Sequence, residues 1–240
     1  MFVLLGEQFT DKSAQVEGQK LALYLNDWWA KEINTKHGVP SFLEIEYETH
    51  YSRFVMPRMR HSEKGSKKRY AGLLKGPNGE ESIVFKGLEN VRSDWTALAR
   101  ELQNKLYSAV FHDQDYQEEI IALIDDLSAG LLDDQLVYRR KLRRPLASYD
   151  KVRPPHVQAA LKAEQRREQA GLLPFYTSGS AVEYVITVHG AEPYEYRQSP
   201  IDYQHYIDKQ IRPVVDGIVC FKGETLADWI EPQSDLFETQ

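Results

Sequence analysis

The first part of the chain alternates between strand-like and helix-like spacing of apolar residues. Residues 2–5 form a short apolar run and residues 42–56 alternate in part, which predicts a strand at each place. Between them, apolar residues recur every three or four positions, the pattern of an amphipathic helix that Asp11 or Ser13 can cap. We therefore expect strands around one long helix. Its apolar face comprises Leu21, Ala22, Leu25, Trp28, Trp29 and Ile33.

A hairpin is predicted next. Residues 68–74 and 82–85 have the composition of strands, and Gly76-Pro77-Asn78-Gly79 between them is a turn sequence. Together with the preceding elements, these strands form a small α+β unit, with a boundary expected near residues 71–77.

From residue 88 onward the spacing becomes mainly helical. Apolar residues recur at three- and four-residue steps, and proline or capping residues begin several of the segments. Pro213 can bend the last helix. The fold class expected is therefore α+β, a small unit of strands and one long helix followed by a mainly helical unit with a few short strands. The predicted helices cover residues 88–111, 115–129, 154–170 and 200 onward, and the predicted strands cover residues 136–142 and 182–188.

Composition limits how the protein can bind a charged partner. The 240 residues are 42% apolar, enough for a folded core, and 30 basic against 36 acidic side chains give a net charge of -6. That balance argues against a protein that wraps nucleic acid with its whole surface. The basic residues are nevertheless concentrated in residues 58–69 and 139–153, so any binding of nucleic acid must use local patches.

The most informative basic segment is Lys67-Lys68-Arg69-Tyr70. Three cations and a tyrosine hydroxyl suit the phosphates of a nucleic-acid backbone and read no bases. In a strand, Lys68 and Tyr70 share one side while Lys67 and Arg69 share the other, so only one pair needs to touch DNA. Taken alone, such a run is more typical of a solvated turn. A second motif at residues 86–95, Lys-Gly-Leu-Glu-Asn-Val-Arg-Ser-Asp-Trp, favours the nucleic-acid interpretation.

The two motifs together resemble the palm-to-thumb junction of family B DNA polymerases. The resemblance extends over nearly the whole chain and is to bacterial members: the apolar run at residues 2–5, the Glu-rich segment at residues 43–48 and the basic segment at residues 136–142 all have counterparts. It implies that residues 1–75 are the C-terminal part of a palm, a palm remnant, that residues 76–230 are a thumb domain, and that residues 231–240 are a flexible tail.

The resemblance also implies DNA-binding residues. Lys68 and Tyr70 match the family's Lys-x-Tyr element, which lies against the primer strand, and Lys67 and Arg69 add positive charge. If the basic residues of the 136–142 segment and just beyond share one strand face, they can follow successive phosphates; a solvated edge strand with protective cations is the alternative. The thumb candidates are Lys86, Arg92, Arg139, Lys141 and Arg143.

The catalytic machinery of the family is expected elsewhere. Family B polymerases hold two Mg²⁺ ions with palm aspartates, and no Asp-Thr-Asp occurs in this sequence. We therefore expect no cofactor, no metal site and no catalysis in this chain alone. Glu48 occupies the place of an accessory palm carboxylate, although an ordinary exposed strand residue is the alternative.

Acidic pairs at residues 125–126 and 133–134 are typical of helix caps and turns, and the seven histidines lack the spacing of metal ligands.

The end of the chain resembles a different binding element. Residues 233–237, Gln-Ser-Asp-Leu-Phe, are similar to the peptide by which bacterial polymerases dock on the sliding clamp. In that reading, Leu236 and Phe237 fill an apolar pocket and the amide of Gln233 hydrogen-bonds at its edge.

These expectations define the partners. They are a primer-template duplex, a bacterial sliding clamp, and the rest of the polymerase, meaning its exonuclease, fingers and N-terminal palm. The intact enzyme would act in repair synthesis and lesion bypass.

A lone cysteine, Cys220, and the lack of an apolar run of about 20 residues predict a cytoplasmic, nucleoid-associated protein that binds no membrane. The alternative is a free-standing, non-enzymatic DNA-binding or clamp-binding protein derived from a thumb.

Overall fold

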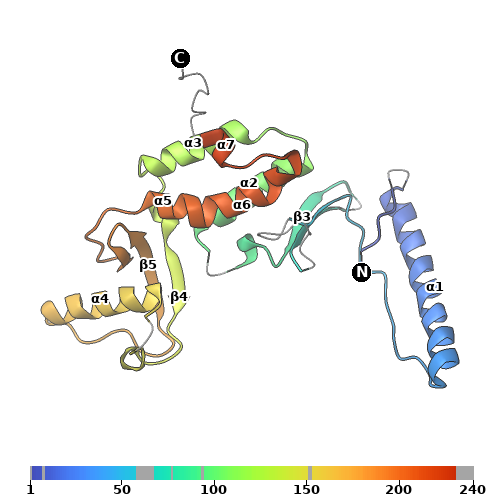
Figure 1. Ribbon diagram of the computed structural model, residues 1–240, viewed down its shortest axis with the longest axis horizontal. Helices are drawn as coiled ribbons and strands as arrows, with labels where there is room; N and C mark the ends of the chain where they lie inside the picture. The colour runs from blue at the N-terminus through green and yellow to red at the C-terminus, as the bar shows by residue number, and fades with distance from the viewer. Residues whose placement is uncertain are drawn as a thin grey trace, which may run out of the picture. The chain divides into compact units, whose positions relative to one another are not determined.

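The computed structural model describes residues 2–6, 9–57, 68–76, 78–92, 95–150 and 153–230 (Figure 1). The chain forms two compact units: unit 1 comprises Met1–Val55 and Gly72–Val84, and unit 2 comprises Met56–Ala71 and Phe85–Gln240. The expected α+β class is confirmed, with several helices and two three-stranded sheets. The helices are α1 (Asp11–His37), α2 (Ala97–Phe111), α3 (Gln117–Ser128), α4 (Pro155–Gln169), α5 (Tyr203–Tyr206), α6 (Arg212–Val219) and α7 (Ala227–Ile230), and the strands are β1 (Arg53–Val55), β2 (Tyr70–Lys75), β3 (Glu81–Lys86), β4 (Tyr138–Lys141), β5 (Ala181–Thr187) and β6 (Gly190–Pro193).

The long helix expected in unit 1 is α1. Its cap is Thr10, one residue before the earliest predicted cap, because Thr10 and Ser13 form a reciprocal capping box. Gly38 ends the helix in the left-handed conformation, with φ of 65°, and its N–H donates to the carbonyl of Asn34. The side chain of Asn26 then ties α1 to the following segment, since its amide nitrogen and oxygen each form a 2.9 Å hydrogen bond with the backbone of Ile45.

One strand predicted in unit 1 was wrong and another was too long. Residues 2–5 form no strand, and Leu4 is 97% exposed. Of residues 42–56, only β1 is a strand. Apolar spacing favours a strand only where a neighbouring strand accepts its hydrogen bonds and another layer covers its face. Little of unit 1 is covered in this way, because its buried apolar residues within the described part are Ala14, Ala22 and Leu73.

The predicted hairpin is confirmed as β2 and β3, which lie next to each other in the sheet order β1-β2-β3. Its turn is closed by a 2.7 Å hydrogen bond from the N–H of Gly76 to the carbonyl of Glu80. The ammonium of Lys75 lies 3.2 Å from the carboxylate of Glu81 at the same end. The opposite end of the hairpin, where β2 begins and β3 ends, belongs to unit 2.

Unit 2 contains the second sheet, in which antiparallel strands follow the order β4-β5-β6 and α4 packs against β5 and β6 (Figure 1). The face of α4 toward the sheet carries Val157, Ala160 and Ala163, all fully buried, and the two alanines allow close approach. The ring of Tyr138 on β4 stacks on Tyr184 of β5 at 5.2 Å between centroids. The positions of α4, β4 and β5 agree with the sequence prediction, whereas β6 was not predicted.

The remaining helices of unit 2 differ from the predicted boundaries in two places. Residues 88–92 are not α-helical as expected, since Glu89–Val91 form a short 3-10 turn, and α2 begins only after Thr96, whose hydroxyl accepts from the N–H of Ala99. The helix expected from Pro200 is divided into α5, a π-helical turn at Ile207–Ile211, and α6. Pro213 has no N–H to donate to the preceding turn, which explains why the regular ladder is interrupted just before it.

None of the helices in the described ranges combines the length and the apolar composition that crossing a membrane requires.

Candidate nucleic-acid interface

The two sequence motifs meet in unit 2 through a buried carboxylate. The guanidinium of Arg69, from the first motif, forms an ion pair with Glu89, from the second. Glu89 is only 5% exposed, and its other oxygen accepts a 2.9 Å hydrogen bond from the amide of Gln103 on α2. A buried carboxylate is costly unless it is paired and hydrogen-bonded, and here both conditions are met.

The hydrogen-bond network continues from Gln103. Its amide oxygen accepts a 2.7 Å hydrogen bond from the N–H of Asn90, and the side chain of Asn90 donates to Asn104 at 2.8 Å. Burial, and after it the Glu89 carboxylate, raises the pKa of the neighbouring Tyr107. The 3-10 turn and α2 are therefore fixed to each other by polar groups that are mostly withdrawn from water.

A glycine allows the two motifs to approach closely. Gly87 has φ of 64°, a left-handed conformation that favours glycine, and a Cβ at this position would collide with the carbonyl oxygen of Lys68. The backbone of the first motif therefore lies directly against the backbone of the second. No side chain can be added at residue 87 without moving one of them.

The first cationic cluster consists of Lys68, Arg69, Tyr70, Lys86 and Arg92. Tyr70 begins β2 and Lys86 ends β3, so the hairpin brings these two residues to one end of adjacent strands. The N–H of Arg92 donates to the carbonyl of Glu89 at 3.0 Å, which places Arg92 beside the same carboxylate residue. Lys68, Lys86 and Arg92 are exposed, Tyr70 is half-buried, and the side chain of Arg69 is engaged by Glu89.

The second cationic cluster consists of Arg139, Arg140, Lys141, Arg143 and Arg144, on and just after β4. All five side chains are exposed. Arg139 lies opposite Glu183 of β5, with 3.6 Å between guanidinium and carboxylate. Because both groups are exposed, this pair contributes about 0–1 kcal/mol to stability.

The expected common strand face includes only Arg139 and Lys141. β4 ends at Lys141, and Arg143 lies beyond it, with its N–H donating to the hydroxyl of Tyr149 at 3.2 Å. The guanidinium of Arg144 stacks over the ring of the same tyrosine at 4.3 Å from its centroid. The turn after β4 is thus organised around Tyr149 rather than continuing as a strand.

His156, in the first turn of α4, was not singled out from the sequence. Burial lowers the pKa of its imidazole, and the positive charges of Arg140 and Arg143 lower it further. These two arginines are therefore close enough to interact with the imidazole electrostatically. No spacing in the sequence links residue 156 to residues 140 and 143, because the fold brings α4 back over the sheet.

The described residues do not offer an obvious metal site. Within the described ranges, no three histidine, cysteine, aspartate or glutamate side chains are placed to hold a metal ion together. Glu48 is exposed in an extended segment without strand pairing.

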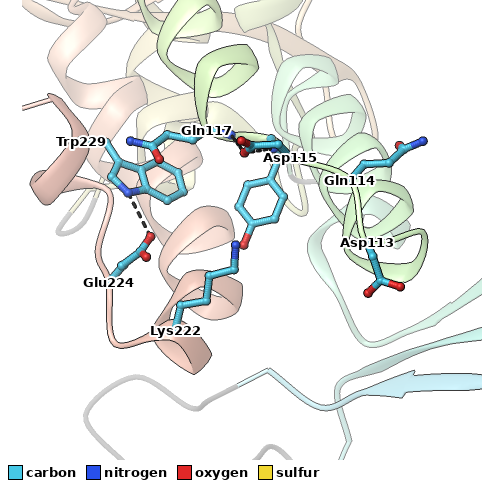
Figure 2. A pocket seen from close by; sticks show the side chains of 8 residues that line it. Asp113, Gln114, Asp115, Gln117, Lys222, Glu224 and Trp229 are labelled. Carbon is cyan, nitrogen blue, oxygen red and sulfur yellow. Dashed lines mark hydrogen bonds between the residues drawn. The ribbon is translucent and has the colours of Figure 1, made fainter.

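A cavity of about 300 Å³ lies beside α3 and α7 (Figure 2). Its polar groups already engage one another: the indole N–H of Trp229 donates to Glu224 at 3.1 Å, and the ammonium of Lys222 is 4.7 Å from the ring centroid of Tyr116. None of the site residues predicted from the sequence lines this cavity. The lining residues are Asp113, Gln114, Asp115, Tyr116, Gln117, Lys222, Glu224 and Trp229.

Several predicted site residues lie outside the described ranges, namely Lys67 in the first motif and Gln233, Leu236 and Phe237 in the tail. Glu89 lies within the second motif, but no pattern in the sequence indicates that its carboxylate is buried. Its role in joining the motifs is visible only in the structure.

The chain belongs to DNA polymerase family B, whose family model matches residues 15–220. Over 236 residues, 98% of the chain, it is 43% identical to DNA polymerase II of Escherichia coli. It is 30% identical over 200 residues to a DNA polymerase of Pyrococcus horikoshii and 34% identical over 172 residues to DNA polymerase 2 of Aeropyrum pernix, covering 78% and 67% of the chain. The resemblance seen in the sequence is thereby confirmed.

The chain spans only part of each relative: 30% of the Escherichia coli protein, 14% of the Pyrococcus protein and 20% of the Aeropyrum protein.

Proposed function

We propose that this chain binds primer-template duplex DNA through its sugar-phosphate backbone, as the palm-and-thumb portion of an enzyme like DNA polymerase II. The observation that carries the proposal is the 43% identity over 98% of the chain to that polymerase. The clustering of Lys68, Tyr70 and Lys86 at one end of the hairpin supports it further. Cations and a hydroxyl at these positions suit phosphate oxygens and carry no information about base sequence.

The thumb contacts of the proposal come from the second cationic cluster. Arg139 and Lys141 extend from β4, and Arg143 follows in the turn that Tyr149 organises. Two arginines can each grip a phosphate with a guanidinium fork, whereas lysine acts as a point charge.

The longer protein would carry out the chemistry. It is proposed to synthesise DNA with Mg²⁺ during repair and past lesions, with the metal-binding aspartates, fingers and exonuclease supplied by the rest of that protein. The chain alone would be inactive and, with its parent, associated with the nucleoid in the cytoplasm. Primer extension by the purified chain with Mg²⁺ and all four nucleotides would contradict this part of the proposal.

The DNA-binding proposal can be tested with one lysine and a matched control. Lys68→Ala should weaken binding of a fluorescent primer-template duplex, because one phosphate loses its counter-charge, and the loss should be similar for duplexes of different sequence. Lys20 is an exposed lysine on α1 that pairs with Glu17, so Lys20→Ala changes net charge equally but should leave affinity unchanged. Equal losses of duplex affinity for both variants would mean that binding depends only on net charge, which would contradict the proposed contact at Lys68.

A second binding activity is proposed for the tail. Gln233, Leu236 and Phe237 would dock on a bacterial sliding clamp, with an affinity near micromolar because a flexible peptide loses entropy on binding. Changing Leu236 and Phe237 together to alanine should abolish binding to a purified clamp in surface plasmon resonance and leave duplex affinity unchanged. Loss of both activities would indicate misfolding, and retained clamp binding would refute the tail proposal.

A further inference from the structure

The first cationic cluster contains one side chain that the fold holds inward. Arg69 lies between Lys68 and Tyr70, and its guanidinium is directed to the buried carboxylate of Glu89. Successive side chains of an extended chain point to opposite sides. Fixing Arg69 toward the interior of unit 2 therefore directs Tyr70, where β2 begins, to the opposite side, and Lys68 lies in the turn just before them.

Glu89 is itself held from the opposite direction. Gln103 on α2 donates to its second carboxylate oxygen at 2.9 Å and accepts from the N–H of Asn90 at 2.7 Å. Gln103 is only 2% exposed, so these bonds compete little with water. The carboxylate thus has one partner on the first motif and one on the first long helix of unit 2, with little freedom to turn.

The backbone supports the same arrangement. Gly87 lies two residues before Glu89, and its lack of a side chain lets the carbonyl of Lys68 approach. The residue that carries the proposed phosphate contact is therefore packed against the turn that carries the buried carboxylate. Backbone and side-chain contacts together fix Lys68 relative to α2.

We propose that Glu89 is a positioning residue for DNA binding: by holding Arg69 between the two motifs, it presents Lys68 and Tyr70 to the duplex. This inference rests on the proposed function, because it assumes that Lys68 contacts phosphate. Arg69 in this account supports the site from within and does not bind DNA. The competing arrangement is one in which Arg69 leaves Glu89 and grips a phosphate itself.

The two arrangements predict opposite results for Glu89→Gln. If Glu89 positions Lys68, removing its charge loosens Arg69, and duplex affinity falls on the order of tenfold. The slope of log affinity against log salt becomes shallower by about 0.9, the value of one phosphate contact. If Arg69 competes for phosphate, the same substitution frees its guanidinium, so affinity rises and the slope steepens by about 0.9.

A double-mutant cycle separates positioning from general damage. In a Lys68→Ala background, Glu89→Gln should weaken binding by less than about twofold further, because the contact it positions is already gone. Additive losses would overturn the proposal, as would an unchanged or higher affinity of the single variant. Glu101→Gln, which removes an exposed carboxylate paired with Lys105 on α2, is the matched control and should have no effect.

A second variant covers the case in which Glu89→Gln folds poorly. Arg69→Lys keeps the charge but replaces the guanidinium fork with a point charge, so a purely electrostatic role predicts unchanged affinity and positioning predicts a loss. Circular dichroism and thermal melting establish that each variant is folded at the assay temperature. If the wild-type chain binds no duplex, the proposed function and this inference fail together; if Lys68→Ala weakens binding and the Glu89 and Arg69 variants do not, only this inference fails.

Discussion

At the scale of single residues, a group whose charge depends on pH, His156, lies close to the second cationic cluster. Burial, followed by Arg140 and Arg143, lowers the pKa of His156 below its usual value near 6.5, so the free protein carries a neutral imidazole at neutral pH. A phosphate placed between these side chains would raise that pKa again. Binding of DNA would then take up a proton.

His156 therefore predicts a pH dependence of duplex affinity. Affinity should increase as the pH falls from 8 toward 6, because the bound complex holds the proton more tightly than the free protein. His156→Gln should remove most of this dependence in fluorescence anisotropy titrations at constant salt. His37→Gln, at the exposed end of α1, should retain it. Identical pH profiles for the wild type and His156→Gln would show that no phosphate lies near this imidazole.

Individual residues also show which parts of the candidate interface could be proposed from the sequence. Lys68, Tyr70 and Lys86 stand in sequence motifs whose charge and order are visible without a structure. Glu89 and His156 do not, because an acidic residue in a basic motif and a lone histidine acquire meaning only from partners brought close by the fold. The sequence shows which residues carry charge, whereas burial and distant partners decide which charges are available.

At the scale of elements, a buried carboxylate joins α4 to the second sheet. Glu192 on β6 accepts hydrogen bonds from the hydroxyl of Ser199 at 2.7 Å and from the N–H of Gln198 at 2.8 Å, and the ammonium of Lys162 on α4 lies 3.7 Å away. Burial alone raises the pKa of Glu192, but these donors outweigh it and lower the pKa to about 2.

This shift predicts acid sensitivity. Because the folded pKa is below the unfolded value of 4.5, the stabilisation is present above pH 4.5 and is lost as the pH falls toward 2. Glu192→Gln should lower the free energy of unfolding at pH 7 by at most about 3 kcal/mol, measured by urea denaturation. The difference between variant and wild type should shrink at pH 3. Glu183→Gln on β5 removes an exposed carboxylate and should change stability by less than about 1 kcal/mol.

The elements themselves were predicted to different degrees. α3 and β5 follow from apolar spacing because each buries one face within unit 2, whereas α4 was predicted from the proline pair that opens it, and β4 buries only Tyr138. α2 was predicted to start at residue 88, since Leu88 and Val91 continue its apolar spacing. Leu88 is buried just before a 3-10 turn, Val91 is exposed, and the hydroxyl of Thr96 fixes the true start. The spacing of apolar residues indicates which positions are buried, and residues can be buried in turns as well as in helices.

At the scale of the whole molecule, the two units differ in how much apolar surface they bury. Within the described part of unit 1, Ala14, Ala22 and Leu73 are the buried apolar residues, and two of these three are alanines. Side chains as large as Leu23, Tyr24 and Phe42 are exposed there. Since burial of large apolar side chains dominates folding free energy, unit 1 contributes little stability of its own.

Hydrogen exchange should reveal this difference. Backbone amides in the middle of α1 should exchange through local opening, with lower protection than amides in the middle of α2 and α4, whose apolar faces are fully buried. Mass spectrometry of peptides after timed exchange gives the comparison directly. Equal protection in α1 and α2 would mean that unit 1 is stabilised by contacts other than apolar burial.

The wrong strand predictions have the same cause, the small amount of apolar surface that unit 1 buries. Residues 2–5 and 42–52 have the composition of strands but lack a covering layer in the described part of unit 1. Such patterns are visible in the sequence, but their partners are not.

The most direct test of the account is the salt dependence of duplex binding by the intact chain. About five neutralised phosphates predict that log affinity falls against log salt with a slope near -4.5, at equal affinity for duplexes of unrelated sequence. A slope near zero, or binding that depends on base sequence, would contradict the claim that the cationic clusters grip the sugar-phosphate backbone.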